Sequence, residues 1–364
     1  MKMTNEEKLK ELYLTKSFFS VGKSLNHCFN CKYCRANDSE FYDYTSVLPG
    51  EVNPLFKSLP VAVNLFYGDP MIQLDNTIEI LKRLEENEHT GPVIIITKGN
   101  IPKDFPQTFN LDLHFGLSTF GTDSVYDGGR FEQFRNNLKT VSKMPYKFSI
   151  EYRPIIRDVN DSDECFSRVV SEAEAYNVGI GYCGLQLSDN LKQRLDKDNV
   201  EFKAYDGVNL GMKKFLPETV HNRLYEIADK HNVHVFKKTS CLLAFTHGKE
   251  RDFNAHYYRP NEVGCYHCPL KEKCFKFKET VKLDNVKIPF DYDIVEKENH
   301  TCVLFRKGIC KFPSYDCTHI SGKLIHIDEP ITTSDVRVIK WLYGVTVDAD
   351  FTEEPFISSK WKIN

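Results

Sequence analysis

The strongest constraint on the fold is a regular alternation of two kinds of segment between residues 61 and 245. Short runs rich in β-branched and aromatic residues alternate with amphipathic stretches of helical length, a pattern typical of β-α units around a parallel sheet. The predicted strands cover residues 18–24, 61–66, 93–97, 113–119, 147–154, 178–184 and 233–236, and the predicted helices cover 75–88, 131–142, 162–176 and 217–231. Seven such strands predict an α/β fold, with the strands in a partial or full parallel (β/α) barrel.

Two further regions follow the alternating part of the chain. Residues 241–287 are rich in cysteine and lysine, and residues 288–364 combine strand-like runs with a helix that begins at Thr333-Ser334-Asp335 and ends before Gly344. We therefore expect a barrel domain over 1–240, a cysteine-rich metal-binding extension over 241–287 and a small α+β domain over 288–364. With 364 residues, of which 41% are hydrophobic, the chain is long enough for this arrangement.

The charge distribution and the absence of apolar segments narrow the class of protein. A net charge of −3 argues against a surface that binds polyanions throughout. Residues 237–287 differ, with eleven Lys and Arg against six Asp and Glu, and this segment suits either a nucleic-acid contact or a solvated face. The sequence has no membrane-length apolar run and no secretory signal in its first 25 residues, so we expect no membrane contact and a cytoplasmic location. Thiols stay reduced there, which favours metal ligands over disulfides.

Three of the twelve cysteines lie within seven residues, just after the first predicted strand: Cys28, Cys31 and Cys34. Three thiolates on one short loop can bind three irons of a [4Fe–4S] cluster. The next ferredoxin-type position is Asp38, so the fourth iron is expected to stay open and able to bind a small molecule. A structural zinc site completed by His27 or by a distant cysteine is the alternative, because such sites close all four positions.

This loop, together with segments that follow the later strands, resembles the radical S-adenosylmethionine (SAM) enzymes over about residues 18–240. The likeness is strongest to the branch of spore photoproduct lyases and DNA-repair-photolyase-like proteins. The spacing Cys-x₂-Cys-x₂-Cys departs from the family's usual Cys-x₃-Cys-x₂-Cys. The resemblance implies a [4Fe–4S] cluster and SAM as cofactors, with reductive cleavage of SAM to a 5′-deoxyadenosyl radical that abstracts hydrogen from the substrate.

The same resemblance implies roles for residues at the strand ends. Tyr33 is expected near the adenine. Lys98 is expected near the SAM carboxylate, with a solvated strand-end lysine as the alternative. The family's Gly-Glu-Pro-type motif, whose backbone receives the SAM amino group, corresponds to Gly68, Asp69 and Pro70.

Later strands add further expected site residues. Ser118 and Thr119 suit the ribose hydroxyls. Glu151 and Arg153 share one strand face, so Arg153 pairs either with a carboxylate of the cofactor or with Glu151. Cys183 lies at the end of a predicted strand and could return a hydrogen atom to the substrate radical, as a cysteine does in photoproduct lyases; a small buried filler is the alternative.

A second cysteine group in the extension indicates a second metal site, which is either another [4Fe–4S] cluster or a zinc ion. It resembles part of the auxiliary-cluster segment of peptide-modifying radical SAM enzymes, although Lys278 stands where a further cysteine is expected. The group consists of Cys241, Cys265, Cys268 and Cys274, whereas Cys302, Cys310 and Cys317 are spaced too widely to assign.

Three functions follow from these patterns. The first is a radical SAM enzyme that repairs or modifies a nucleic acid or nucleotide. The second is a radical SAM enzyme that modifies a peptide or protein side chain with help from an auxiliary cluster. The third is a zinc or iron–sulfur binding module without turnover. Either enzyme also needs a one-electron reductant of the flavodoxin or ferredoxin kind.

Overall fold

The structure is a computed structural model of the whole chain. It describes residues 12–15, 18–23, 29, 31–34, 43–45, 47–63, 68–124, 126–186, 189–198, 200, 202–203, 205, 216–253, 263–280, 286–297, 322–352 and 357–361. Several residues singled out above lie outside the described residues, namely His27, Cys28, Asp38, Cys302, Cys310 and Cys317.

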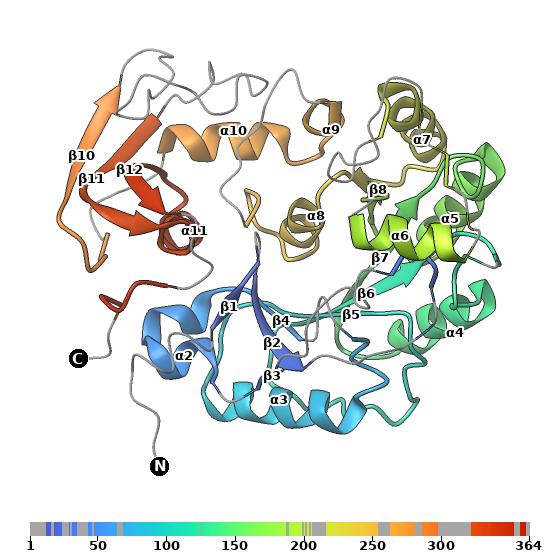
Figure 1. The fold of residues 1–364 in the computed structure, drawn as a ribbon, viewed down its shortest axis with the longest axis horizontal. Helices are drawn as coiled ribbons and strands as arrows, with labels where there is room; N and C mark the ends of the chain where they lie inside the picture. The colour runs from blue at the N-terminus through green and yellow to red at the C-terminus, as the bar shows by residue number, and fades with distance from the viewer. Residues whose placement is uncertain are drawn as a thin grey trace.

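A parallel sheet of seven strands forms the centre of the molecule (Figure 1). The parallel strands run in the order β2-β4-β5-β6-β7-β8-β9, so the predicted α/β fold is confirmed. Two short strands pair antiparallel with β2. No pairing between described strands joins β9 back to β1, so the barrel is partial. The strand bounds are β1 Tyr13–Leu14, β2 Phe19–Lys23, β3 Asp43–Tyr44, β4 Val61–Val63, β5 Val93–Thr97, β6 Leu113–Thr119, β7 Lys147–Ile155, β8 Ile180–Gly184 and β9 Val235–Phe236.

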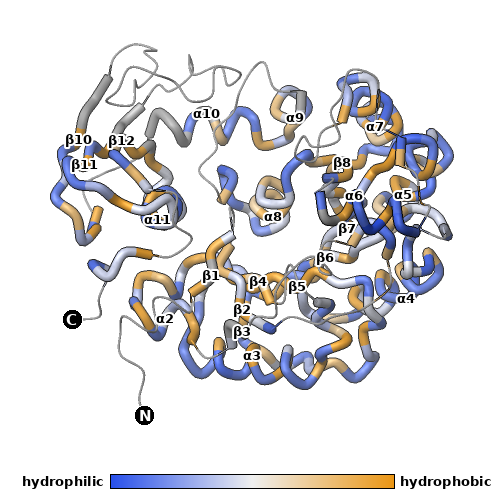
Figure 2. The backbone as a smooth tube through the Cα atoms, viewed as in Figure 1, coloured by the Kyte–Doolittle hydropathy of each residue, from blue (hydrophilic) through white to orange (hydrophobic). Residues whose placement is uncertain are grey.

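All four predicted helices are present on the outer side of this sheet (Figure 1). Each buries one apolar stripe, and Figure 2 shows the resulting change between apolar and polar residues along the tube. Local capping sets the ends of α5, because the Ser162 hydroxyl accepts the Cys165 N–H at 3.2 Å and Asn177 adopts a left-handed conformation. The helices of this region are α2 Pro49–Val52, η2 Pro54–Ser58, α3 Leu74–Glu86, α4 Phe131–Val141, α5 Asp163–Tyr176, α6 Asp189–Lys197, α7 Glu218–Lys230 and α8 Thr239–Thr246.

Strand alternation separates an outer from an inner face of the sheet. Outward residues such as Phe115 and Ile150 belong to the main core beneath the helices. On the inner face, Ala62 and Ile94 pack with Leu243 of α8. Helix α8 follows β9 directly and contacts β7, β8 and β9, so it occupies part of the inner face of the partial barrel.

The carboxyl-terminal part contains a second sheet of order β10-β11-β12 with α11 between its last two strands. The helix ends at Gly344, as predicted, where the backbone is left-handed at φ 65°. The Trp341 ring lies 5.6 Å from Phe19, and the Trp361 ring lies 5.4 Å from Phe56, so the hydrophobic core continues from one part into the other. The elements are α9 Val263–Tyr266, α10 Lys271–Thr280, β10 Tyr292–Lys297, β11 Gly322–Thr332, α11 Thr333–Tyr343 and β12 Thr346–Thr352.

The membrane prediction can be checked against the helices. None of those that the structure describes is both long enough and apolar enough to cross a bilayer. The proposed boundaries at 240 and 287 remain predictions.

A buried polar cluster lies at the amino end of β6 and β7. His247 Nδ1 lies 2.7 Å from a carboxylate oxygen of Asp112, and His114 Nε2 lies 2.8 Å from the Ser149 hydroxyl. Burial raises the pKa of Asp112, but hydrogen bonds from His247 and Lys147 outweigh it and hold that pKa below its usual range. The cluster fastens the end of α8 to the sheet.

Two buried histidines predict a loss of stability in mild acid. Burial holds the pKa of His114 well below its usual value and lowers that of His89 to about 4. Below about pH 6.5 the unfolded chain binds protons at these rings while the native protein does not. The free energy of unfolding therefore decreases as the pH is lowered. Each ring contributes a slope of up to about 1.4 kcal/mol per pH unit. Urea denaturation at pH 7, 6 and 5 measures that slope, and His114→Gln and His89→Gln should each reduce it. Equal slopes in both variants and the wild type would contradict the prediction.

Candidate functional site

The cysteine loop lies beyond the carboxyl end of β2, the edge at which parallel sheets usually bind ligands. Residues 31–34 form a tight turn in which the Cys34 N–H donates to the Cys31 carbonyl at 3.0 Å. Cys31 is 7% exposed and Cys34 is half-buried. Two of the predicted ligands therefore lie on one backbone turn, while Cys28 lies outside the described residues.

Residues in and directly after α6, together with Phe120 after β6, contact the cysteine loop. The Lys32 ammonium lies 2.9 Å from the Asp198 carboxylate, and the Arg194 guanidinium donates to the Cys34 carbonyl. The Tyr33 ring stacks on Phe120 with centroids 5.3 Å apart. Side chains from two other elements thus fix the orientation of the cysteines.

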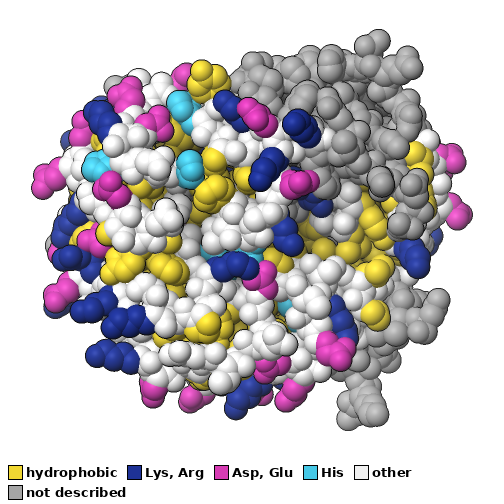
Figure 3. Space-filling view, turned by 180° about the vertical axis from the view of Figure 1, so that it is seen from behind, with side chains coloured by type: hydrophobic (Ala, Val, Ile, Leu, Met, Phe, Trp, Pro, Cys, Tyr) yellow, Lys and Arg dark blue, Asp and Glu magenta, His cyan; other side chains and the backbone are white. Residues whose placement is uncertain are grey.

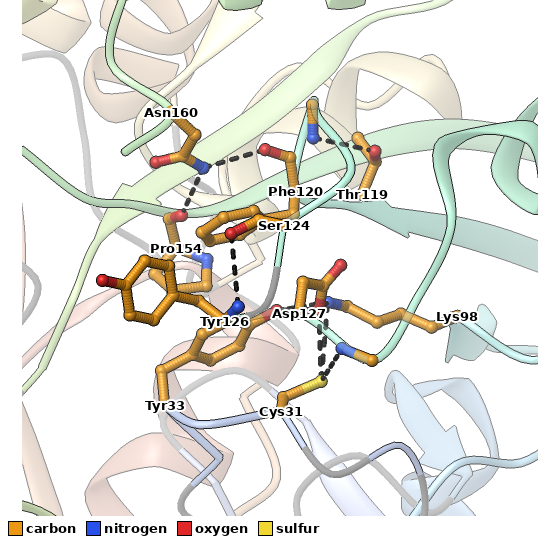
Figure 4. A network of polar contacts seen from close by, with 12 residues as sticks. Cys31, Tyr33, Lys98, Thr119, Phe120, Ser124, Tyr126, Asp127, Pro154 and Asn160 are labelled. Atoms are coloured by element: carbon orange, nitrogen blue, oxygen red, sulfur yellow. Dashed lines mark hydrogen bonds and ion pairs between the residues drawn. The ribbon is translucent and has the colours of Figure 1, made fainter. Parts of the chain in front are cut away.

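A buried carboxylate that the sequence analysis did not single out lies at the centre of the site (Figure 4). One oxygen of Asp127 accepts hydrogen bonds from the Lys98 ammonium, from the Tyr33 hydroxyl and, at 3.1 Å, from the Cys31 thiol. The Lys98 nitrogen lies 4.0 Å from the same sulfur. The side chains of Asp127 and Lys98 are only 3% and 12% exposed. Lys98 is therefore at the cysteine loop, but its charge is offset by Asp127 rather than solvated.

Burial also decides the protonation of these groups. It raises the pKa of Cys31 to about 11, because the nearby Lys98 ammonium only partly compensates for the loss of solvent. It raises the pKa of Tyr33 well above its usual value as well. A thiol in this environment becomes a thiolate when a metal ion displaces its proton, so the donor chemistry suits a metal or an iron–sulfur cluster.

The Gly68-Asp69-Pro70 motif is joined to the end of β5 by the Asp69 carboxylate, which is 6% exposed. One oxygen accepts the Met71 N–H at 2.9 Å and the Thr97 hydroxyl at 2.6 Å; the other accepts the Lys98 and Gly99 N–H groups at 2.7 and 3.1 Å. The Asp69 side chain is therefore a brace that orients the backbone from which Lys98 projects.

The inner face of β6 and β7 carries three of the other predicted polar residues, Ser118, Glu151 and Arg153. The Arg153 Nε lies 3.4 Å from the Glu151 carboxylate, so the ion pair left open as an alternative is what the structure contains. The Thr239 hydroxyl lies 3.2 Å from both side chains. Ser118 is paired in register with Glu151. Thr119 lies on the opposite strand face, and its hydroxyl accepts the Gly121 N–H at 3.0 Å.

Cys183 lies near this ion pair on the adjacent strand β8. It is half-buried, and strand alternation places it on the same face as Gly181. A Cβ at Gly181 would lie 2.9 Å from the Glu151 carboxylate. Cys183 is thus on the inner face, next to the part of the interior lined by Glu151.

The second cysteine group borders the same inner face. Cys241 lies two residues after Thr239, in the first turn of α8. Burial raises the pKa of Cys241, and the nearby Asp252, Cys268 and Cys265 raise it further. Cys241 is therefore within electrostatic range of Cys265 and Cys268. Among the described residues, however, no three His, Cys, Asp or Glu side chains adopt a metal-ligating arrangement.

No family model and no curated protein sequence matches the chain. Several solved structures resemble it in part, two of them as follows. A spore photoproduct lyase variant shares 11% identity over 56% of this chain and 72% of its own, with a TM-score of 0.41. A radical SAM methyltransferase from Sphaerobacter thermophilus shares 13% identity over 60% of this chain and 65% of its own, with a TM-score of 0.40. Such similarity says nothing about the substrate, because one fold can host many reactions.

Asn160 braces the loops around the site, and its removal should destabilise the protein. This fully buried amide accepts the Ile156 N–H at 2.7 Å and donates to the Phe120 and Pro154 carbonyls at 2.9 Å each (Figure 4). Because Asn160→Ala leaves buried groups unsatisfied, we expect the free energy of unfolding to fall by about 2–4 kcal/mol. Asn136→Ala, on the exposed face of α4, should change it by less than about 0.5 kcal/mol. Urea denaturation measures both, and equal stability of the two variants would contradict this role.

Proposed function

We propose that the protein is a radical SAM enzyme whose cysteine loop holds a [4Fe–4S] cluster with one open iron. The observation that supports this most directly is the buried Cys31 thiol at the carboxyl edge of the parallel sheet, with the Lys98 ammonium 4.0 Å from its sulfur. One oxygen of Asp127, the carboxylate beside that sulfur, accepts from Lys98 and Tyr33, so this oxygen is already bound within the protein.

The residues around the loop suit the binding of SAM. When bound, the cluster supplies the electron that cleaves SAM reductively. Lys98 provides a positive charge for the SAM carboxylate, and Gly68 provides the backbone carbonyl for its amino group. The carbonyls of Asp69 and Pro70 already accept hydrogen bonds within the fold. Ser118 on the inner face is the hydroxyl for the ribose, and the Tyr33 ring borders the adenine side.

Beyond SAM, the Glu151–Arg153 pair makes the inner face polar, and α8 shields part of it from water. We propose Cys183, on the same face, as the residue that returns a hydrogen atom to a substrate radical. A flavodoxin- or ferredoxin-like protein in the cytoplasm is the proposed source of the electron.

The proposed substrate is a nucleic acid or nucleotide, supported by the motif resemblance and by the lysines of α10. On the face shown in Figure 3, acidic and basic side chains are interspersed over the described surface. A phosphate backbone would therefore contact a local patch rather than the whole molecule. The second candidate, a peptide or protein substrate, is favoured by the position of the second cysteine group beside the inner face.

That second group is itself proposed to bind a metal. Three of its thiols are close enough to affect one another's pKa, and Cys274 is buried on α10. Four thiolates suit either a zinc ion or a second [4Fe–4S] cluster. Iron and zinc analysis of a Cys268→Ala variant distinguishes the two.

The cluster proposal is tested with Cys31→Ala. Anaerobically reconstituted wild-type protein should contain about four irons in this loop and form 5′-deoxyadenosine from SAM and dithionite. Cys31→Ala should lose about four irons per chain and all product, while Cys165→Ala, at a half-buried thiol on α5, should lose neither. Zinc in place of iron, with no 5′-deoxyadenosine from the wild type, would leave the third function, a passive metal-binding module, whereas undiminished 5′-deoxyadenosine in Cys31→Ala would contradict the assignment of the cluster to this loop.

The nucleic-acid proposal predicts salt-dependent binding through α10. Reversing the charge of its exposed lysines by Lys271→Glu, Lys273→Glu and Lys276→Glu should weaken retention of single-stranded DNA or RNA at least tenfold and flatten its dependence on salt. Charge reversal at Lys82, Lys139 and Lys230, exposed on the outer helices, is the matched control. Equal binding by the two triple variants in a fluorescence-anisotropy titration would instead favour a peptide substrate.

A further inference from the structure

The segment Tyr126-Asp127-Gly128, which follows β6 and is called here the clasp segment, contacts the cysteine loop at several points. At one end of the clasp segment, the Tyr126 carbonyl accepts a hydrogen bond from the Lys32 N–H at 2.9 Å. At the other end, the Gly128 N–H donates a hydrogen bond to the Cys31 sulfur at 3.4 Å. Between them, the Asp127 carboxylate binds Lys98, Tyr33 and Cys31 (Figure 4).

The approach of the two backbones requires a glycine at position 128. A Cβ at Gly128 would collide with the carbonyl of Phe29, which is backbone of the cysteine loop itself. The neighbouring Gly129 is different, because a Cβ there meets only side-chain atoms of Asp127 and Lys98, at 3.3 and 3.5 Å. An added methyl group at Gly128 would therefore force the clasp segment away from the loop, whereas one at Gly129 would not.

The contacts of the clasp segment would change the stability of the negative charge on the Cys31 sulfur when that sulfur binds a metal. An N–H that points at a metal-bound thiolate stabilises its negative charge, and such hydrogen bonds are among the factors that set the reduction potential of iron–sulfur clusters. A carboxylate close to the same sulfur has the opposite effect, since the cluster becomes more negative on reduction. Once Cys31 has lost its proton to a metal, the sulfur and Asp127 repel each other, and the Lys98 ammonium, which contacts Asp127 and lies 4.0 Å from the sulfur, limits that repulsion.

We propose that the clasp segment is the positioning element of the cysteine loop, and that its Gly128 N–H and its Asp127–Lys98 pair set the reduction potential of the bound cluster. The second half of this proposal rests on the proposed function, whereas the first half holds for any metal in the loop. In this proposal, Gly128, Asp127 and Lys98 do not themselves bind the metal.

The positioning half is tested by comparing Gly128→Ala with Gly129→Ala. Metal content per chain at the loop is measured as the difference from Cys31→Ala in the same background. Gly128→Ala should retain less than half of the wild-type metal, and Gly129→Ala should retain all of it, with both variants showing the wild-type thermal unfolding midpoint without metal. Equal metal content in the two glycine variants would overturn the positioning role. Because the measurement counts any metal, it is valid even if the loop holds zinc.

The electrostatic half is tested with Asp127→Asn, which keeps the shape of the side chain and removes its charge. We expect full iron content and a midpoint potential more positive than that of wild type in an EPR-monitored redox titration. Asp161→Asn, an acidic residue on the loop before α5, should leave the potential unchanged. An unaltered potential in Asp127→Asn would overturn this half, and loss of the iron would overturn it as well, because the carboxylate would then be needed to hold the cluster rather than to set its potential. Zinc in the wild-type loop would overturn both this half and the proposed function, while leaving the glycine comparison to decide the first half.

Discussion

The buried contact between Lys98 and Asp127 is the interaction on which the candidate site depends. It joins the end of β5 to the segment after β6, and through Tyr33 and Cys31 it joins both to the loop after β2. A buried ion pair stabilises a fold only when its desolvation is offset by further hydrogen bonds. Asp127 meets that condition, because two more donors reach its carboxylate. The cost of burying the pair is therefore compensated by the same contacts that fix the cysteine loop.

Other buried polar side chains extend this arrangement along the carboxyl edge of the sheet. Asp69 fixes the loop after β4 to the end of β5, and Asn160 fixes the loop after β7 to the end of β6. Asp69 lies in the Gly68-Asp69-Pro70 motif, yet both Asp69 and Asn160 use their side chains within the protein. Such residues act on a ligand only by holding the backbone and the neighbouring charge in place. Rigid strand ends joined in this manner are a suitable support for a metal site.

Helix α8 links the inner face to the second cysteine group. Its apolar residues fill part of the inner face, its first turn places Thr239 against Glu151 and Arg153, and its last residue lies next to the buried His247. Cys241 lies between these two ends of the helix. Helix α8 therefore connects the polar residues of the inner face to the start of the second cysteine group, while α9 and α10 contact α7 and β11.

The sequence by itself determined the parallel strands, the four outer helices and the local turn of the cysteine loop, whereas α6 and α8 were not predicted. The strands at 93–97 and 113–119 were predicted to the residue, because their β-branched runs and their flanking turns are local signals. Cys31 and Cys34 meet because their spacing fits one turn. Only the tertiary structure decided that Asp127 lies beside Cys31, that Arg153 pairs with Glu151, and that α8 enters the inner face. Asp127 is 96 residues away from Cys31 and belongs to no periodic pattern, so its role arises from the parallel order of β2, β5 and β6. Contacts between distant segments depend on which strands become neighbours, and that depends on the packing of the whole core rather than on any local run of residues.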